Sequence, residues 1–138
     1  MHTLRQELEY LSLHWIAHGL PSREQVLAAA RALIRLKRKN RGQDLWPTPP
    51  RIITATLDDA VGQGIDVINL FAQAMGIDVT SLGLLQRPET IVSACRAVRP
   101  EYLGLTVLQA DSEDALAFVG RHLPPCTRLL AGGPAFKY

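Results

Sequence analysis

The chain has 138 residues, and 47% of them are apolar, which suits one domain with a buried core. No window approaches the ~18 uninterrupted apolar residues of a membrane span. Residues 1–19 mix apolar with charged side chains, so we expect a cytoplasmic protein without a targeting segment. The formal charge of +2 is unevenly divided: residues 1–50 hold eight Lys or Arg against four Asp or Glu, whereas residues 51–138 hold seven against nine.

Two amphipathic helices are predicted in the basic part, over residues 3–18 and about 23–39. The first carries an apolar stripe at helical spacing, formed by Leu4, Leu8, Leu11 and Trp15. Ser22 and Gln25 have the spacing of a capping box at the start of the second helix. Because two helices alone cannot bury such stripes, we expect residues 1–45 to form a helical cap that packs on the rest of the chain.

A basic run, R-L-K-R-K-N-R, closes the second helix at residues 35–41. Clustered cations can bind nucleic-acid phosphates, but no aromatic side chains are interleaved here for base stacking. Cations also suit the negative end of a helix dipole, and we favour that interpretation over a nucleic-acid site. The sequence W-P-T-P-P at residues 46–50 is then a stiff linker between the two parts.

From residue 51 onward, apolar runs typical of strands alternate with amphipathic segments typical of helices. Strands are predicted at about 52–57, 78–83, 102–107 and 128–131. Helices are predicted at about 64–75, from Pro88, and after Ser112, which is placed to cap the last one. Alternation of this kind requires parallel strands with crossover helices. Residues 51–138 are therefore predicted to form an α/β domain with a flavodoxin-like (Rossmann-like) sheet of about four strands, which have the order 2-1-3-4 if strand one is central.

That strand order creates a crevice at the carboxyl ends of strands one and three, faced by the loops 58–64 and 106–111. Asp58 and Asp59 begin the first loop, and we expect them to cap the following helix or to bind an amide edge of a ligand. No convincing set of nucleophile, base and orienting residue can be assembled. The chain ends soon after strand four, so a protein partner or the N-terminal helices could cover one sheet edge.

Three kinds of phosphate-handling site are excluded, because the chain lacks a residue that the chemistry of each one requires. A Walker loop needs a Lys after its glycines, and none is present. A dinucleotide fingerprint finds Gly62 and Gly64, but Val67 stands in place of the third Gly. A receiver domain needs an Asp at the end of strand three, where this chain has Thr106.

Residues 51–133 resemble the cobalamin (vitamin B12)-binding domain family, which is found in methionine synthase, acyl-CoA mutases, corrinoid methyl carriers and B12-sensing regulators. Residues 59–64 (D-A-V-G-Q-G) match the Asp and the last Gly of the family's D-x-H-x-x-G. Residues 81–92 (S-L-G-L-L-Q-R-P-E-T-I-V) look like its second strand and following helix, and residues 104–108 (G-L-T-V-L) are similar to its G-L-S-x-L. The Gly132-Gly133 pair stands where the nucleotide tail approaches the backbone in that family.

The resemblance implies a cobalamin site at the carboxyl edge of the sheet, with Thr106 as a hydrogen-bond donor. Its implied cofactor-binding residues are Asp59, Val61, Gly62, Gly64, Thr106, Leu108, Gly132 and Gly133. Val61 stands where the family has its cobalt-ligating histidine, and valine has no electron pair to donate. Histidine ligation from the sheet domain is therefore not expected. Haem, which a related group is said to hold, is the alternative cofactor.

His14 and His18 stand one helical turn apart beside the stripe of the first helix. In several family members a helical segment covers the upper face of the corrin. The resemblance thus implies that Leu11 and Trp15 form a lid and that one of the two histidines is a metal ligand. Two half-exposed histidines beside a core stripe are the alternative.

The function implied by this resemblance is binding of a corrinoid, or a related tetrapyrrole, by a sensor or accessory protein that is not catalytic alone. Two alternatives stay open: the corrinoid-carrying subunit of a methyltransferase or radical enzyme, and an interaction module without a cofactor. We expect a protein partner or a homo-oligomer, and neither nucleic-acid nor membrane binding.

Overall fold

The computed structural model describes residues 3–39, 45–109 and 112–132. Its helices are α1 (Leu4–His18), α2 (Arg23–Lys39), α3 (Gln63–Ala74), α4 (Pro88–Val98) and α5 (Glu113–His122), and its strands are β1 (Arg51–Thr56), β2 (Asp78–Gly83), β3 (Tyr102–Thr106) and β4 (Arg128–Gly132). Each predicted element is present, with ends close to those expected from the sequence. No helix in the described ranges has the length and apolar character needed to cross a bilayer.

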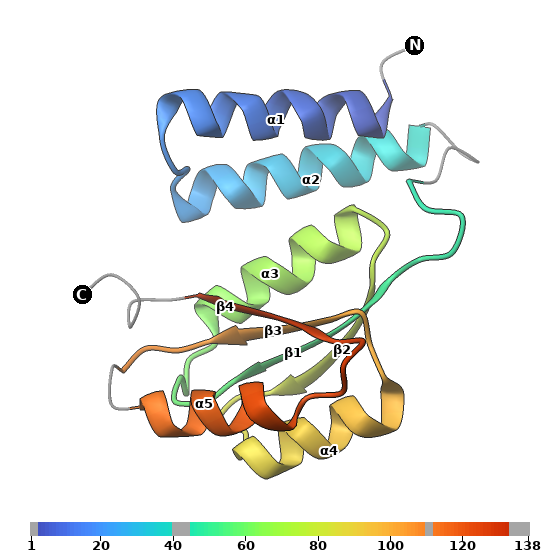
Figure 1. Ribbon diagram of the computed structural model, residues 1–138. Coiled ribbons are helices and arrows are strands. Elements are labelled where there is room, and N and C mark those ends of the chain that lie inside the picture. Colours follow the sequence, from blue (N-terminus) through green and yellow to red (C-terminus); the bar gives the residue numbers. More distant parts are fainter. Residues whose placement is uncertain (1–2, 40–44, 110–111, 133–138) are drawn as a thin grey trace.

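The four strands are parallel and follow the order β2-β1-β3-β4, as predicted. Helix α3 covers one face of the sheet, and α4 and α5 cover the other (Figure 1). This is a flavodoxin-like α/β fold. Its register places Thr56, Thr106 and Gly132 side by side at the carboxyl ends of β1, β3 and β4. In this strand order the switch point lies between β1 and β3, which is where ligands bind in open α/β sheets.

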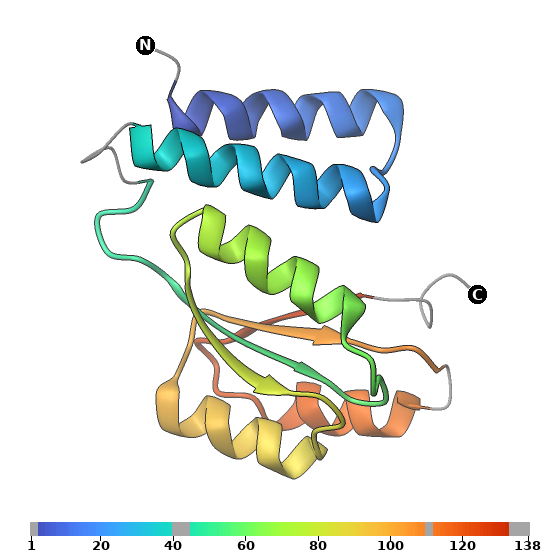
Figure 2. The same cartoon turned by 180° about the vertical axis from the view of Figure 1, so that it is seen from behind.

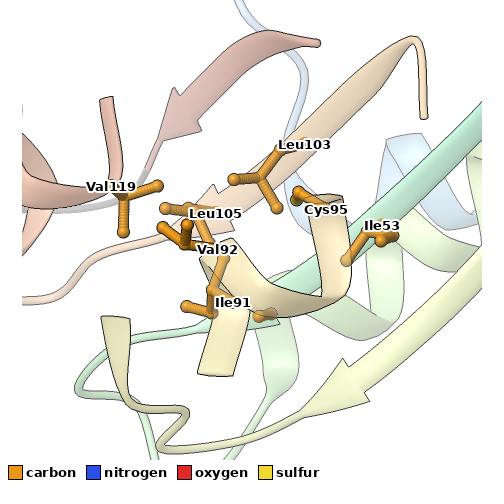
Figure 3. Packing of buried hydrophobic residues seen from close by; sticks show 8 residues of the cluster. Ile53, Ile91, Val92, Cys95, Leu103, Leu105 and Val119 are labelled. Atoms are coloured by element: carbon orange, nitrogen blue, oxygen red, sulfur yellow. The ribbon is translucent and has the colours of Figure 1, made fainter. Parts of the chain in front are cut away.

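The face that carries α4 and α5 is apolar. Ile53 from β1 and Leu103 and Leu105 from β3 point to this side, because alternate strand residues face opposite ways. The helices contribute Ile91, Val92, Cys95 and Val119 to the same cluster (Figure 3). Each fully buried side chain of this size contributes about 1.5–3 kcal/mol to folding, so this cluster is the main source of stability for the sheet.

The face that carries α3 buries Ile52 near the start of β1, but toward the carboxyl edge its central strands carry glycine and threonine side chains. The Thr54 hydroxyl donates to Asn69 Oδ1 of α3 at 2.6 Å. Gly104 lies beside Thr54 in the register, and a Cβ atom there would lie 3.5 Å from Thr54 Cγ2. Thr56 and Thr106 continue this row toward the carboxyl edge, and all three threonines are buried. The sheet therefore presents hydroxyl groups beneath the first turns of α3.

Helices α1 and α2 form an antiparallel pair on the outer side of α3, and their connection lies on the same side of the molecule as the carboxyl ends of the strands (Figures 1 and 2). The contact is built from the predicted stripe and from residues of α2 and α3: Leu4, Ala30, Leu33 and Ala74 are buried in it. The predicted capping box is also present, since Gln25 N–H donates to Ser22 Oγ and Ser22 N–H donates to Gln25 Oε1.

Candidate ligand-binding site

The loop after β1 is shaped by Asp59, whose side chain is only 5% exposed. Its Oδ1 accepts hydrogen bonds from Val61 N–H at 2.8 Å and from Gly62 N–H at 3.1 Å. Gly62 is the N-cap residue of α3, with φ of 82°, and α3 has no side-chain cap. The prediction that Asp59 caps this helix is therefore wrong, because its carboxylate is used to fold the loop that precedes the helix.

Asp58 points away from Asp59 and joins its own loop to the loop after β3. Its carboxylate accepts from Leu108 N–H at 2.7 Å, from Gln109 N–H at 2.8 Å and from the Ser112 hydroxyl at 2.8 Å. Burial raises the pKa of Asp58, but these three hydrogen bonds outweigh it and hold the pKa below its ordinary value. Asp58 does not cap α3. Ser112 is the N-cap residue of α5, as predicted, but its hydroxyl donates to Asp58 and makes no hydrogen bond to the helix.

This link confirms that the loops after β1 and β3 lie side by side at the carboxyl edge of the sheet, as the strand order predicts. The remaining residues of the predicted second loop, 110 and 111, lie outside the described residues. The two adjacent aspartates thus serve two loops, and both carboxylates accept hydrogen bonds from backbone amides.

Thr56, the last residue of β1, joins a third loop to the same edge. Its hydroxyl donates to the Asp59 carbonyl at 2.7 Å and accepts from Leu85 N–H at 2.8 Å. Its carbonyl accepts from Gln86 N–H at 2.8 Å, which fixes the turn between β2 and α4. The sequence interpretation did not include Thr56 in the site. Its only sequence signal is a hydroxyl at the end of a central strand, directly before two aspartates.

Thr106 occupies the same level of the sheet on β3, and its side chain is 6% exposed. Among the described residues, its hydroxyl is the one buried side-chain polar atom without a hydrogen-bond partner. Gly64, in the first turn of α3, lies against it: a Cβ atom at Gly64 would lie 3.6 Å from Thr106 Cγ2. A buried hydroxyl without a partner costs about 1–3 kcal/mol, so this group is suited to a hydrogen bond with a bound molecule.

The loops at this edge of the sheet expose apolar side chains, and we refer to this part of the surface as the mouth. Val61 is 72% exposed, Leu85 57% and Leu108 40%, and Leu84 lies over Gly62. Val61 and Leu108 were predicted from the sequence as site residues, whereas Leu84 and Leu85 were not. Exposed apolar side chains around one buried polar group are typical of a small-molecule site.

The fourth strand contributes glycine to the same edge. Gly132 ends β4 and accepts a hydrogen bond from Val107 N–H at 2.9 Å. A Cβ atom at Gly132 would meet nothing within 4 Å, so the fold itself does not require glycine there. Gly133, the other member of the predicted pair, lies outside the described residues.

His14 and His18 lie on the exposed side of α1. Their ring centroids are 4.4 Å apart, and the His14 ring stacks on Tyr10 at 5.8 Å. The described ranges hold no group of three or more His, Cys, Asp or Glu side chains that could bind a metal ion by itself. His18 ends α1 on the side of the molecule where the strands end (Figures 1 and 2). Metal ligation by either histidine stays a prediction.

A hollow of about 810 Å³ lies away from this edge, beside α1, and is lined by residues of α1, the end of α3 and the linker. The Trp15 and Phe71 rings, 6.0 Å apart between centroids, meet at its wall. Its lining includes Leu8, Trp15, Ile16, Trp46, Phe71 and Met75. We place the candidate site at the carboxyl edge and not in this groove, because the groove's lining is mainly apolar, whereas the edge holds the unpaired Thr106 hydroxyl.

Comparison with known proteins supports the fold assignment. No protein-family profile matches the chain, and no curated protein matches it either. Solved structures do match. A cobalamin-binding protein from Desulfitobacterium hafniense DCB-2 superposes with a TM-score of 0.62 at 22% identity, over 87% of this chain and 60% of that one. The methanol:cobalamin methyltransferase complex MtaBC from Methanosarcina barkeri gives 0.56 at 19% identity, over 90% of this chain and 50% of that one.

The fold is shared with cobalamin-binding proteins. At these identities the likeness establishes the arrangement of helices and strands, and this chain spans 60% and 50% of the lengths of the two matched chains.

Proposed function

We propose that this protein binds a corrinoid, cobalamin, at the carboxyl edge of its sheet, as a sensor or accessory protein. The observation that carries the proposal is the buried, unpaired hydroxyl of Thr106 at the switch point between β1 and β3. The neighbours described as cobalamin-binding support the choice of ligand. Haem, the alternative from the sequence, gains no support from them.

The residues at the edge fit such a ligand. Thr106 offers a hydroxyl to an amide or phosphate of the ligand, and Gly64 and Gly132 leave room beside it. The loop from Asp59 to Gly62 and the exposed Leu108 border the same crevice, and Gly133 follows directly after β4. Bound cobalamin would supply cobalt chemistry, and the chain would hold it and exclude water.

Among the described residues of the loop after β1, we propose no ligand for cobalt. Val61 occupies the position of the family's histidine, and its side chain is 72% exposed at the mouth. Asp58 and Asp59 already accept hydrogen bonds from backbone amides. If cobalt receives a protein nitrogen, it comes from His14 or His18 on α1, which we propose as the ligands to test.

The test is an absorption spectrum of the purified protein after incubation with hydroxocobalamin and desalting, with haem run in parallel. We expect retained corrin bands and no retained haem. Thr106→Val keeps the shape of the side chain without the hydroxyl and should retain less cobalamin, whereas the matched surface change Thr80→Val on β2 should not. A colourless wild-type protein in both incubations would contradict the proposal.

A second candidate is the corrinoid-carrying subunit of a methyltransferase. The match to MtaBC, a methyltransferase complex, favours it. Exposed Leu13 and Ile16 on α1 would give a catalytic subunit an apolar surface to bury. Methyl transfer to or from the bound corrinoid in a reconstituted pair would establish this role. Cobalamin binding without turnover in such a pair would leave the sensor role as the better account.

A further inference from the structure

The turn between β2 and α4 displays two leucines at the carboxyl edge of the sheet. Leu84 is 36% exposed and Leu85 57% exposed. They follow Gly83, at which β2 ends beside Ala55 after an irregularity in the register. Burial of apolar side chains is the usual outcome in a folded chain, so two consecutive exposed leucines next to a crevice require a reason.

Leu85 also has an unfavourable backbone conformation. Its φ is +51°, in the left-handed region, where a side chain larger than glycine is strained. Glycine or asparagine would adopt this conformation more readily. In the described part of the chain, Arg99 is the other non-glycine residue with positive φ, and it ends α4 in an ordinary C-cap geometry.

The strained turn is held by specific contacts. Leu85 N–H donates to the Thr56 hydroxyl and Gln86 N–H to the Thr56 carbonyl, both at 2.8 Å. Leu84 packs over Gly62, where a Cβ atom would lie 2.8 Å from Leu84 Cδ2. The same Thr56 hydroxyl binds the loop of Asp59. The turn is therefore fixed relative to the crevice, and strained residues fixed in this way tend to occur at ligand sites.

We infer that Leu84 and Leu85 form an apolar shelf on which the flat macrocycle of the ligand rests, with Leu85 as a residue that determines affinity. This inference rests on the proposed function and adds a second surface to the site. Thr106 receives a polar arm of the ligand, and the shelf covers part of the ring face. Together with the exposed Val61, the shelf makes this part of the carboxyl edge apolar.

The Leu85→Gly variant distinguishes a role of Leu85 in ligand binding from a role in stabilising the fold. Glycine relieves the left-handed strain and removes the side chain, so the thermal unfolding temperature of the ligand-free protein should stay the same or rise. The dissociation constant for hydroxocobalamin should increase about tenfold, a change that equals ~1.4 kcal/mol. Leu85→Ala keeps the strained backbone and should weaken binding to a similar extent. The matched control is Leu130→Ala, which removes an exposed leucine, 53% exposed, from the edge strand β4.

The measurements are titrations of each variant with hydroxocobalamin, followed by absorption, beside thermal unfolding without ligand. If both Leu85 variants bind hydroxocobalamin with unchanged affinity, the inferred shelf is wrong, whereas the proposed cobalamin binding stands. A joint loss of stability and affinity in Leu85→Gly would also overturn it, because the residue would then be structural. Absence of cobalamin binding by the wild-type protein would instead contradict the proposed function, and the shelf with it.

Discussion

The two faces of the sheet are made from the same strands but have different compositions. The face under α4 and α5 buries Ile53, Leu103 and Leu105, whereas the face under α3 presents Thr54, Thr56 and Thr106. Alternation along β1 and β3 assigns these side chains to opposite sides. The apolar face supplies most of the burial that stabilises the sheet. The hydroxyl face fixes the loops through Thr56 and, among the described residues, leaves the buried Thr106 hydroxyl without a hydrogen-bond partner.

This difference predicts that stability and binding can be changed separately. The largest expected effect is on the apolar face. Leu103→Ala removes a fully buried side chain and leaves a cavity between β3 and α4, so the free energy of unfolding should fall by about 3 kcal/mol. Chemical denaturation measures it. Cobalamin affinity of the remaining folded protein should be unchanged, and a large loss of affinity would show that the two faces are not independent.

An intermediate effect is expected where the two loops meet. Asp58→Asn keeps the size of the side chain but removes the charge that Leu108 N–H, Gln109 N–H and Ser112 share. Because the side chain is partly exposed, we expect a loss of about 1.5 kcal/mol. Hydrogen exchange should accelerate at the Leu108 and Gln109 amides. Unchanged exchange there would mean that the loop is held by other contacts.

The pH dependence of the stability that Asp58 contributes follows from the direction of its pKa shift. The pKa of Asp58 is lower in the folded protein than its ordinary value of 3.8, so its stabilising contribution is fully present above that pH. The contribution is lost as the pH falls through the lowered value. The stability difference between wild type and Asp58→Asn should therefore be constant from pH 5 to pH 8 and shrink below about pH 4. A difference that persists in acid would exclude the charge as its cause.

The smallest change in stability is expected at Thr106, and it is a gain, whereas the preceding variants lose stability. Thr106→Val removes a buried hydroxyl that has no partner, so the ligand-free protein should gain about 1 kcal/mol. The same variant should bind cobalamin less tightly. If Thr106→Val instead destabilises the ligand-free protein, its hydroxyl has a partner in the free state, and the main support for the site is removed.

The predictions from sequence succeeded where short-range pattern decides structure. The parallel strands followed from the alternation of apolar runs and amphipathic segments, and the order 2-1-3-4, predicted with strand one at the centre, is confirmed. The Ser22 capping box followed from two residues at fixed spacing. They failed for side chains whose partners are distant in sequence. Ser112 stands at the predicted N-cap position of α5, but its hydroxyl binds Asp58, 54 residues away, and Asp58 does not cap the helix that it was predicted to cap.

The sequence by itself determined the elements, their order and the edge of the sheet at which a ligand would bind, because apolar periodicity and strand topology are local or follow from general rules. Only the tertiary structure decided which groups at that edge are free. Thr56 and Thr106 are both threonines at the ends of central strands. One has its hydroxyl bound by two loops, and the other is buried without a partner. That difference depends on how three loops fold against one another, which no spacing in the sequence encodes.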